Sequence, residues 1–234
     1  MLDKGTTVDR ADKYGQTPLF VACAEGHVDA VRLLLDNGAA VDRAEKHGAT
    51  PLFIACQNGH VDAARLLLDN GAEVDRAAKN GATPLYAACA NGQVDAARFC
   101  LEHGANIERS SWTPLLFSCF FGDVEAVQRH LESGAEVDRA DQAGRTPLLV
   151  ACWQGHVDAA RLCLDRGAEV DQAMKDGRTP LFVACAEGQV DAARLLLEKG
   201  AKLDRAAEDG MTPLSIAKSK DHSSIVALLA EHRK

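Results

Sequence analysis

Two kinds of short apolar segment alternate along the chain. Residues 19–23 form an unbroken apolar run, whereas residues 28–35 carry apolar side chains around the polar pair Asp29 and Arg32. Both segments are interpreted as helices of fewer than three turns, and helices this short are not stable alone in water. The pattern therefore predicts helices that are stabilised by packing against their neighbours.

Residues that favour helix ends flank both segments. Thr17 is a good N-cap before the first segment, and Pro18 suits the first helical position, where no N–H partner is needed. Gly26 follows the first segment and Gly38 the second, as expected at helix C-termini. Residues 40–48 are predicted to be an extended, hairpin-like connection to the next helix.

The same pattern occurs seven times. All seven prolines of the chain lie in Thr-Pro-Leu, and we number each repeat from its threonine as position zero. The step between threonines is 33 residues, except for one step of 30 between Thr83 and Thr113. A fixed period in this range predicts stacked structural repeats. The seven threonines are Thr17, Thr50, Thr83, Thr113, Thr146, Thr179 and Thr212.

The repeat resembles the ankyrin repeat family. The residues that carry the resemblance are Asp12, Gly15, Thr17-Pro18-Leu19, Gly26-His27 and Leu33-Leu34-Leu35, followed by Gly38-Ala39. The resemblance implies an all-α solenoid of stacked antiparallel helix pairs with short β-hairpin fingers. It also implies a function in binding other proteins.

We expect one ankyrin-type array over residues 1–234. Residues 1–8 match the end of a preceding repeat, which suggests a fragment of a longer protein or, less favoured, an array that begins with a half repeat. The last unit has Asp221 in place of glycine and a polar run, as expected for a capping repeat. The predicted repeats are 9–41, 42–74, 75–107, the shortened 108–137, 138–170, 171–203 and the capping 204–234.

The charge balance limits the partners. Thirty-four acidic and 26 basic residues give a net charge of −8, which argues against a general binder of nucleic acid or of anionic membranes. No apolar run approaches the roughly 18 residues of a membrane-spanning helix, and the first residues lack a secretory signal. We therefore expect an intracellular protein, cytoplasmic or nuclear.

The eight cysteines are predicted to be structural. Six lie at position +6 of a repeat, and Cys100 and Cys163 lie at +17. Equivalent points on packed helices are about 8–10 Å apart, and a disulfide requires Cα atoms within about 7 Å. Buried, reduced thiols are the interpretation, and they suit an intracellular protein.

No catalytic or metal site stands out from the repeat. His27, His60 and His156 each follow a cysteine by four residues, but the glycine before each histidine ends the helix that would align metal ligands. A structural role in the loop is the favoured interpretation. We expect neither an enzyme nor a cofactor, and no metal ion.

Departures from the repeat indicate the predicted binding surface for a partner. The fourth finger is three residues shorter than the others, and aromatic residues gather at partner-facing positions of repeats four and five. These residues are the predicted apolar anchors, because exposed aromatic groups often mark interaction surfaces. The alternative is that the rings fold inward to fill the space of the missing finger residues. The residues are Trp112, Phe120, Phe121 and Trp153.

Basic residues recur along the fingers. Lys79 and Lys175 lie at position −4, and Arg145 and Arg178 at −1. They are the predicted polar rim of the binding surface and could steer an acidic peptide toward it. The alternative is that these side chains only keep the finger tips soluble.

The sequence thus predicts a non-catalytic module that binds a protein or peptide on its concave and finger surface. Two alternatives remain open: a structural spacer or scaffold within a larger multidomain protein, and an engineered ankyrin binding scaffold. We expect a monomer, with end-to-end association possible through an uncapped first repeat.

Overall fold

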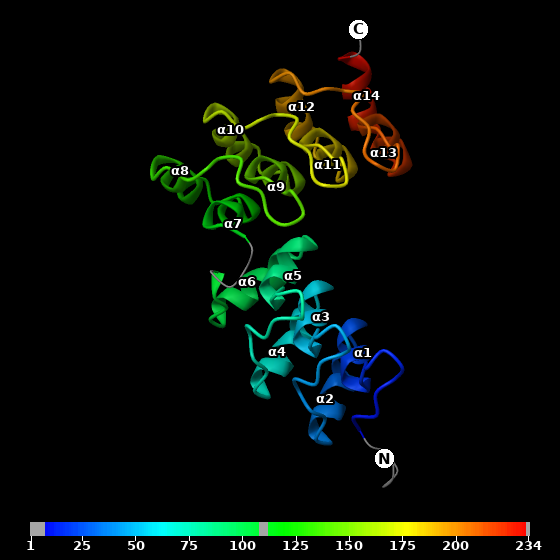
Figure 1. Ribbon diagram of the computed structural model, residues 1–234. Coiled ribbons are helices and arrows are strands. Elements are labelled where there is room, and N and C mark those ends of the chain that lie inside the picture. Colours follow the sequence, from blue (N-terminus) through cyan, green and yellow to red (C-terminus); the bar gives the residue numbers. More distant parts are fainter. Residues whose placement is uncertain (1–7, 108–111, 233–234) are drawn as a thin grey trace. The chain divides into compact units, whose positions relative to one another are not determined.

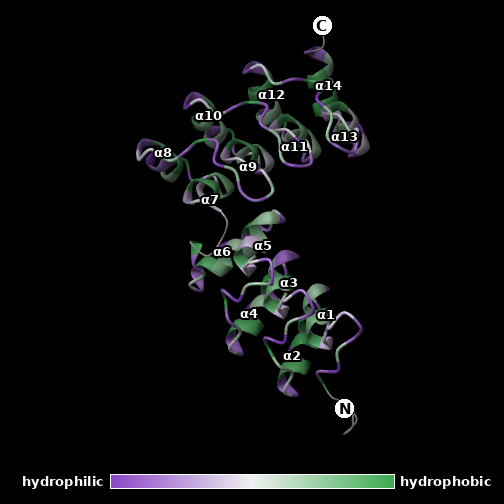
Figure 2. Cartoon of the chain, in the orientation of Figure 1, coloured by the Kyte–Doolittle hydropathy of each residue, from purple (hydrophilic) through white to green (hydrophobic). Residues whose placement is uncertain are grey.

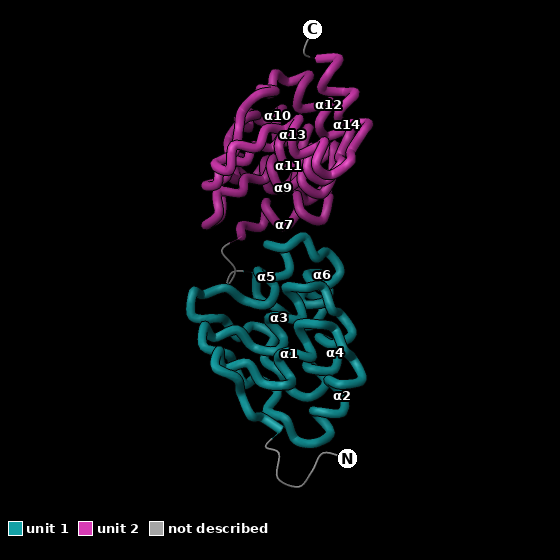
Figure 3. Tube along the Cα trace, turned by 90° about the vertical axis from the view of Figure 1, so that its right-hand side faces the viewer, with its two compact units in different colours: residues 1–111 teal, residues 112–234 magenta. Residues whose placement is uncertain are grey.

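The computed structural model describes residues 8–107 and 112–232. Within these ranges, fourteen α-helices form seven consecutive pairs (Figure 1). The chain divides into two compact units, residues 1–111 and residues 112–234 (Figure 3). We describe each unit by itself.

Unit 1 contains three helix pairs. They are α1 (Pro18–Ala24) with α2 (Val28–Asp36), α3 (Pro51–Gln57) with α4 (Val61–Asp69), and α5 (Pro84–Ala90) with α6 (Val94–Glu102). Unit 2 contains four pairs. They are α7 (Pro114–Phe121) with α8 (Val124–Glu132), α9 (Pro147–Gln154) with α10 (Val157–Asp165), α11 (Pro180–Ala186) with α12 (Val190–Glu198), and α13 (Pro213–Ser219) with α14 (Ser223–Glu231).

The first helix of every pair begins as the sequence predicts. In repeat one, the Thr17 hydroxyl accepts a hydrogen bond from the Phe20 N–H at 3.1 Å, and Pro18 occupies the first helical turn. The other six threonines cap their helices in the same way. A capping bond of this kind stabilises a helix by about 1 kcal/mol. It also fixes the same starting residue in each repeat.

Stacking of the first helices builds the core of each unit. In unit 1, α3 packs between α1 and α5, and in unit 2, α9 packs between α7 and α11. Apolar residues concentrate on these helices (Figure 2). Leu19, Leu52 and Leu85 are fully buried at position +2, as is the cysteine at +6 of each first helix but the last. The predicted all-α repeat solenoid is confirmed.

The fingers contain no β-strand within the described residues. Neighbouring fingers are joined by single backbone hydrogen bonds, from Lys46 N–H to Tyr14 O at 3.1 Å and from Lys79 N–H to His47 O at 2.9 Å. Lys175 N–H makes the corresponding bond to Ala143 O in unit 2, at 3.0 Å. One bond between two turns is too little for a ladder, so the expected hairpins are turns instead.

Polar side chains also join the two ends of a repeat. Asp9, Asp42 and Asp75 in unit 1 each accept a hydrogen bond from a backbone N–H that lies 31 residues later. Asp138 and Asp171 do the same in unit 2. In these five repeats, a carboxylate therefore holds the residues that follow the second helix to the start of the same repeat.

The residue at position +10 joins neighbouring repeats. His60 Nε2 lies 3.1 Å from Ala24 O, and His156 Nε2 lies 3.1 Å from Phe120 O. Gln189 replaces histidine in repeat six and donates to Trp153 O at 3.4 Å. These contacts support the predicted structural role of His60 and His156, because each ring bonds the last turn of the preceding first helix.

Candidate partner-binding surfaces

The eight residues predicted to bind a partner are divided between the units. Lys79 lies in unit 1, and the other seven residues lie in unit 2. The structure separates the seven into a buried group and a surface group.

Trp112 and Arg145 belong to a buried polar network. The indole Nε1–H of Trp112 donates to Asp141 Oδ2 at 2.8 Å. Arg145 Nε donates to the same oxygen at 2.7 Å, and Arg145 Nη2 lies 2.7 Å from it. The guanidinium of Arg145 is 5.3 Å from the centroid of the Trp112 ring. Trp112 is only 2% exposed and Arg145 only 5%.

The same carboxylate shapes the finger of repeat five. Asp141 Oδ1 accepts the backbone N–H groups of Ala143 and Arg145, each at 2.9 Å. Both oxygens of Asp141 are therefore hydrogen-bonded, as a buried carboxylate requires. The network ties Trp112, which precedes α7, to the finger that precedes α9.

Phe120 is buried in contact with this network. Its ring centroid lies 5.4 Å from that of Trp112 in an edge-on arrangement, and Phe117 lies at the same distance. Phe120 is fully buried, whereas Phe121 packs edge-on against it at 5.2 Å and stays partly exposed.

The expectation that Trp112, Phe120 and Arg145 face a partner is therefore corrected. The alternative reading, in which the rings fold inward beside the shortened finger, describes these residues. The physical reason is Asp141, which offers the indole N–H and the guanidinium a buried acceptor. Position within the repeat could not reveal this acceptor, because it lies 29 residues from Trp112.

Trp153 has a different environment. Its side chain is partly buried against a core cluster that includes Leu149, Phe182 and Val183. Other partly buried apolar side chains pack against the same cluster. We call this surface the Trp153 face, and its partly buried members are Trp153, Met174, Ala186, Met211 and Ile216.

Two cationic side chains border the Trp153 face. Arg178 is exposed, with its guanidinium 5.6 Å from the Phe182 ring centroid and its Nε 3.5 Å from Asp176 Oδ2. Lys175 is exposed and follows Met174 directly in the finger. The structure thus brings Trp153, Lys175 and Arg178 around one apolar surface.

The sequence analysis missed Met174 and Met211. The chain has three methionines, and these are the two that follow Met1. They lie at positions −5 and −1, where no other repeat has methionine. This departure from the repeat was a usable signal.

Unit 1 has an open groove beside Lys79. A cavity of about 390 Å³ lies between two neighbouring fingers and α3. Lys79 is exposed, and Phe53 is partly exposed. The lining residues are His47, Ala49, Phe53, Gln57, Ala78, Lys79 and Asn80.

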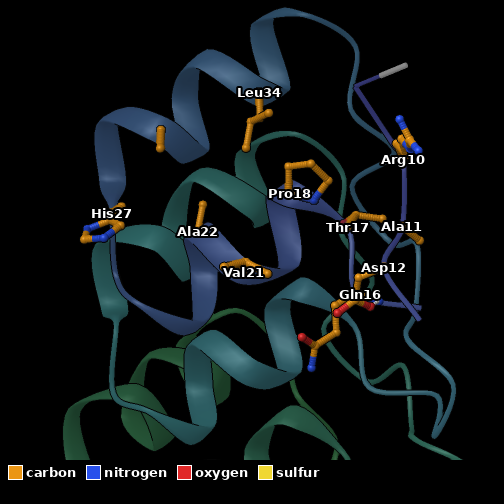
Figure 4. Close-up of a pocket in the computed structure, with 11 residues that line it drawn as sticks. Arg10, Ala11, Asp12, Gln16, Thr17, Pro18, Val21, Ala22, His27 and Leu34 are labelled. Atoms are coloured by element: carbon orange, nitrogen blue, oxygen red, sulfur yellow. Dashed lines mark hydrogen bonds between the residues drawn. The ribbon is translucent and has the colours of Figure 1, made fainter. Parts of the chain in front are cut away.

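A larger pocket of about 610 Å³ lies on the first repeat (Figure 4). Pro18, Ala22 and Val21 of α1 line it together with Leu34 of α2. Pro18 is exposed, whereas Pro51, the corresponding residue of repeat two, is buried. This pocket therefore lies on the face of repeat one that corresponds to the face of repeat two packed against repeat one.

The described residues contain no group of three or more histidine, cysteine or acidic side chains that could hold a metal ion. Burial raises the pKa of the Cys23 and Cys185 thiols to about 12, so neither is a nucleophile near neutral pH. Across residues 8–107 and 112–232, we find no helix with the length and apolar character needed to span a bilayer.

Comparisons with known proteins agree with this architecture. The family model for ankyrin repeats in three copies matches residues 1–78, 74–141 and 115–207. The crystal structure of the human ASB11 ankyrin repeat domain is similar, with 32% sequence identity and a TM-score of 0.51. The alignment covers 92% of this chain and 97% of that domain. A search among curated proteins gave no match. The chain belongs to the ankyrin repeat family.

Proposed function

We propose that this chain is a non-catalytic module that binds a segment of another protein on the Trp153 face. Ankyrin repeats are generally protein–protein interaction modules. The observation that carries the proposal is the grouping of Trp153, Met174 and Met211 at the surface of one apolar cluster. Tryptophan is enriched among residues that dominate binding energy, and methionine adapts its shape to different partners.

The chemistry of this surface suggests the chemistry of the partner. Apolar side chains of the partner would cover Trp153 and the two methionines, and this contact would remove apolar surface from water. Lys175 and Arg178 would attract acidic groups at the edge, mainly by increasing the rate of association. Phe121 would add apolar contact, and Lys79 would give unit 1 a cationic groove of its own.

Trp112, Phe120 and Arg145 have a supporting role in this proposal. The contacts of Trp112 and Arg145 with Asp141 fix the finger of repeat five, and Phe120 packs against the Trp112 ring. The tip of this finger bonds the finger that carries Met174 and Lys175. Replacing them would disturb the face without removing a direct contact with the partner.

The test compares two apolar side chains of unit 2, the partly exposed Trp153 and the exposed Val124. Trp153→Ala removes the proposed anchor, and Val124→Ala removes a 38% exposed side chain of α8 as the matched control. Both variants and the parent chain are used to capture partners from cell lysate, with quantification of each captured protein. Affinity for a retained partner is then measured with the purified proteins.

We expect Trp153→Ala to weaken binding by about 2 kcal/mol, or roughly thirtyfold, and Val124→Ala to leave it unchanged. Equal capture by the two variants would contradict the proposal and direct attention to the groove beside Lys79. Failure of the parent chain to capture any protein would favour the spacer or scaffold alternative.

A further inference from the structure

Two pairs of buried cysteines lie in contact, one pair in each unit. Cys56 Sγ lies 3.4 Å from Cys100 Sγ, and Cys119 Sγ lies 3.7 Å from Cys163 Sγ. All four side chains are fully buried free thiols. In each pair one cysteine comes from a first helix and the other from the second helix of the next repeat.

The two pairs arise from one departure from the repeat. Cys56 and Cys119 occupy position +6, and their partners occupy position +17 of the following repeat. The other +17 residues are Leu34, Leu67, His130, Leu196 and Leu229. Cys100 and Cys163 thus each meet the +6 cysteine of the preceding repeat, whereas Leu67, Leu196 and Leu229 stand in the same relation to a +6 cysteine without adding a second thiol. The sequence analysis compared equivalent positions alone and so missed these contacts.

We propose that Cys56–Cys100 and Cys119–Cys163 are two reversible oxidation sites, at which a peroxide converts each thiol pair into a disulfide that joins neighbouring repeats. A disulfide requires the sulfur atoms to approach to about 2.05 Å. The remaining movement is short, because each pair is already in van der Waals contact.

The reaction balances with hydrogen peroxide as the oxidant. One thiolate attacks a peroxide oxygen and becomes a sulfenic acid, and the peroxide O–O bond breaks to release hydroxide. The second thiolate attacks the sulfenic sulfur and displaces another hydroxide as the S–S bond forms. The two thiol protons combine with the two hydroxides, so two thiols and one peroxide give one disulfide and two waters.

Access to the thiols requires the repeats to separate. The contact with Cys100, together with burial, raises the pKa of the Cys56 thiol, and the contact with Cys163 acts likewise on Cys119. Thiolate is therefore scarce in the closed state. Local opening exposes the thiols, and re-closing then brings each pair back within reaction distance.

A disulfide at either site would oppose further opening. Each bond would close a loop between residues that are 44 positions apart. Restricting a loop of this size in the unfolded chain lowers the unfolding equilibrium constant by up to about a thousandfold. Oxidation would thus convert a stack of separable repeats into two cross-linked pairs of repeats.

The test counts and locates the disulfides. The full chain is treated with increasing hydrogen peroxide, and its remaining thiols are then alkylated in denaturant and counted by mass. Cleavage after lysine and arginine places each of the eight cysteines in a different peptide, so every cross-link identifies its own two residues.

Two variants and one control complete the design. Cys100→Leu and Cys163→Leu each introduce the residue that other repeats carry at +17, beside a first-helix cysteine. Cys185→Ala removes a buried first-helix thiol that is followed by Leu229 at +17 and serves as the control. Folding of each variant is checked by its urea unfolding midpoint before oxidation.

We expect the parent chain to fall from eight free thiols to four, with cross-links only between 56 and 100 and between 119 and 163. Each leucine variant should lose one cross-link, and Cys185→Ala should lose neither. The oxidised parent chain should unfold at higher urea, and dithiothreitol should reverse the change. Scattered cross-links, eight unreacted thiols under conditions that oxidise the unfolded chain, or an unchanged midpoint would each overturn the proposal.

Discussion

The two tryptophans of unit 2 lie in adjacent repeats and have opposite roles in the structure. Trp112 donates its indole N–H to the buried carboxylate of Asp141 and is 2% exposed. Trp153 is partly exposed among methionines at the edge of a core cluster. An aromatic residue at a position where the other repeats have none can therefore be buried in the core or partly exposed at the surface. Trp112 is buried beside a hydrogen-bond acceptor for its indole N–H.

The difference can be traced to the two fingers. The finger that precedes α9 carries Asp141, which binds both Trp112 and Arg145. The finger that precedes α11 carries Met174 at the same position of the repeat. Methionine provides apolar contact and only a weak acceptor. Trp153 and Met174 both pack against the same core cluster and form part of an apolar surface.

The largest effect should come from Trp112→Ala. Removing this buried ring leaves a cavity beside Phe117 and Phe120 and takes a donor from Asp141. We expect the free energy of unfolding of unit 2 to fall by about 4 kcal/mol. Urea unfolding followed by circular dichroism measures the change, and a loss below 1 kcal/mol would mean that the ring is not part of the core.

Asp141→Asn should have a slightly smaller effect. The amide keeps an acceptor for the finger N–H groups, but it removes the carboxylate charge that lies 2.7 Å from Arg145 Nη2. Breaking one partner of a buried ion pair costs about 3 kcal/mol. The same urea titration tests this prediction, with a control variant, Asp138→Asn, in which the replaced carboxylate accepts the Glu169 N–H. Equal losses in the two variants would show that the Arg145 pair contributes nothing specific.

Trp153→Ala should distinguish the Trp153 face from the buried Trp112 site most clearly, by a small effect on stability and a larger effect on binding. Because the ring is only partly buried, we expect the free energy of unfolding to fall by about 1 kcal/mol, well below the value for a buried tryptophan. The predicted loss of binding energy is larger than this loss of stability. A stability loss as large as that of Trp112→Ala would show that Trp153 is also a core residue.

Lys175→Ala should have the smallest effect. Its side chain is exposed at the edge of the Trp153 face, and exposed charges contribute less than about 1 kcal/mol. We expect a reduction in binding of a few fold that shrinks as salt is raised to about 0.5 M, since salt screens exposed charges. Binding measured at two salt concentrations tests this, and a loss independent of salt would place Lys175 in a buried contact.

Much of the fold follows from local signals. Thr17 and its six counterparts start helices wherever Thr-Pro-Leu occurs, because capping and a fixed proline φ act within one turn. Gly26 adopts a φ of +69°, which glycine tolerates and other residues rarely do. Its close neighbour is His60 of the next repeat, where an added Cβ would lie 2.5 Å from the ring.

The candidate surface was only partly accessible to sequence reasoning. Trp153, Lys175 and Arg178 were identified from their positions in the repeat, and the structure brings them together. Trp112, Phe120 and Arg145 were identified by the same reasoning but are buried. A repeat position specifies the direction of a side chain in an average unit, and the shortened fourth repeat is not an average unit.

By itself, the sequence determined the repeats, the residues at which the first helices begin and the ankyrin family, because each depends on residues that are close together in the chain. Only the tertiary structure decided which tryptophan is buried and which cysteines meet. Asp141 lies 29 residues from Trp112, and Cys56 lies 44 residues from Cys100. Contacts between unlike positions of neighbouring repeats depend on how the repeats pack, and one repeat period read along the chain does not contain that information.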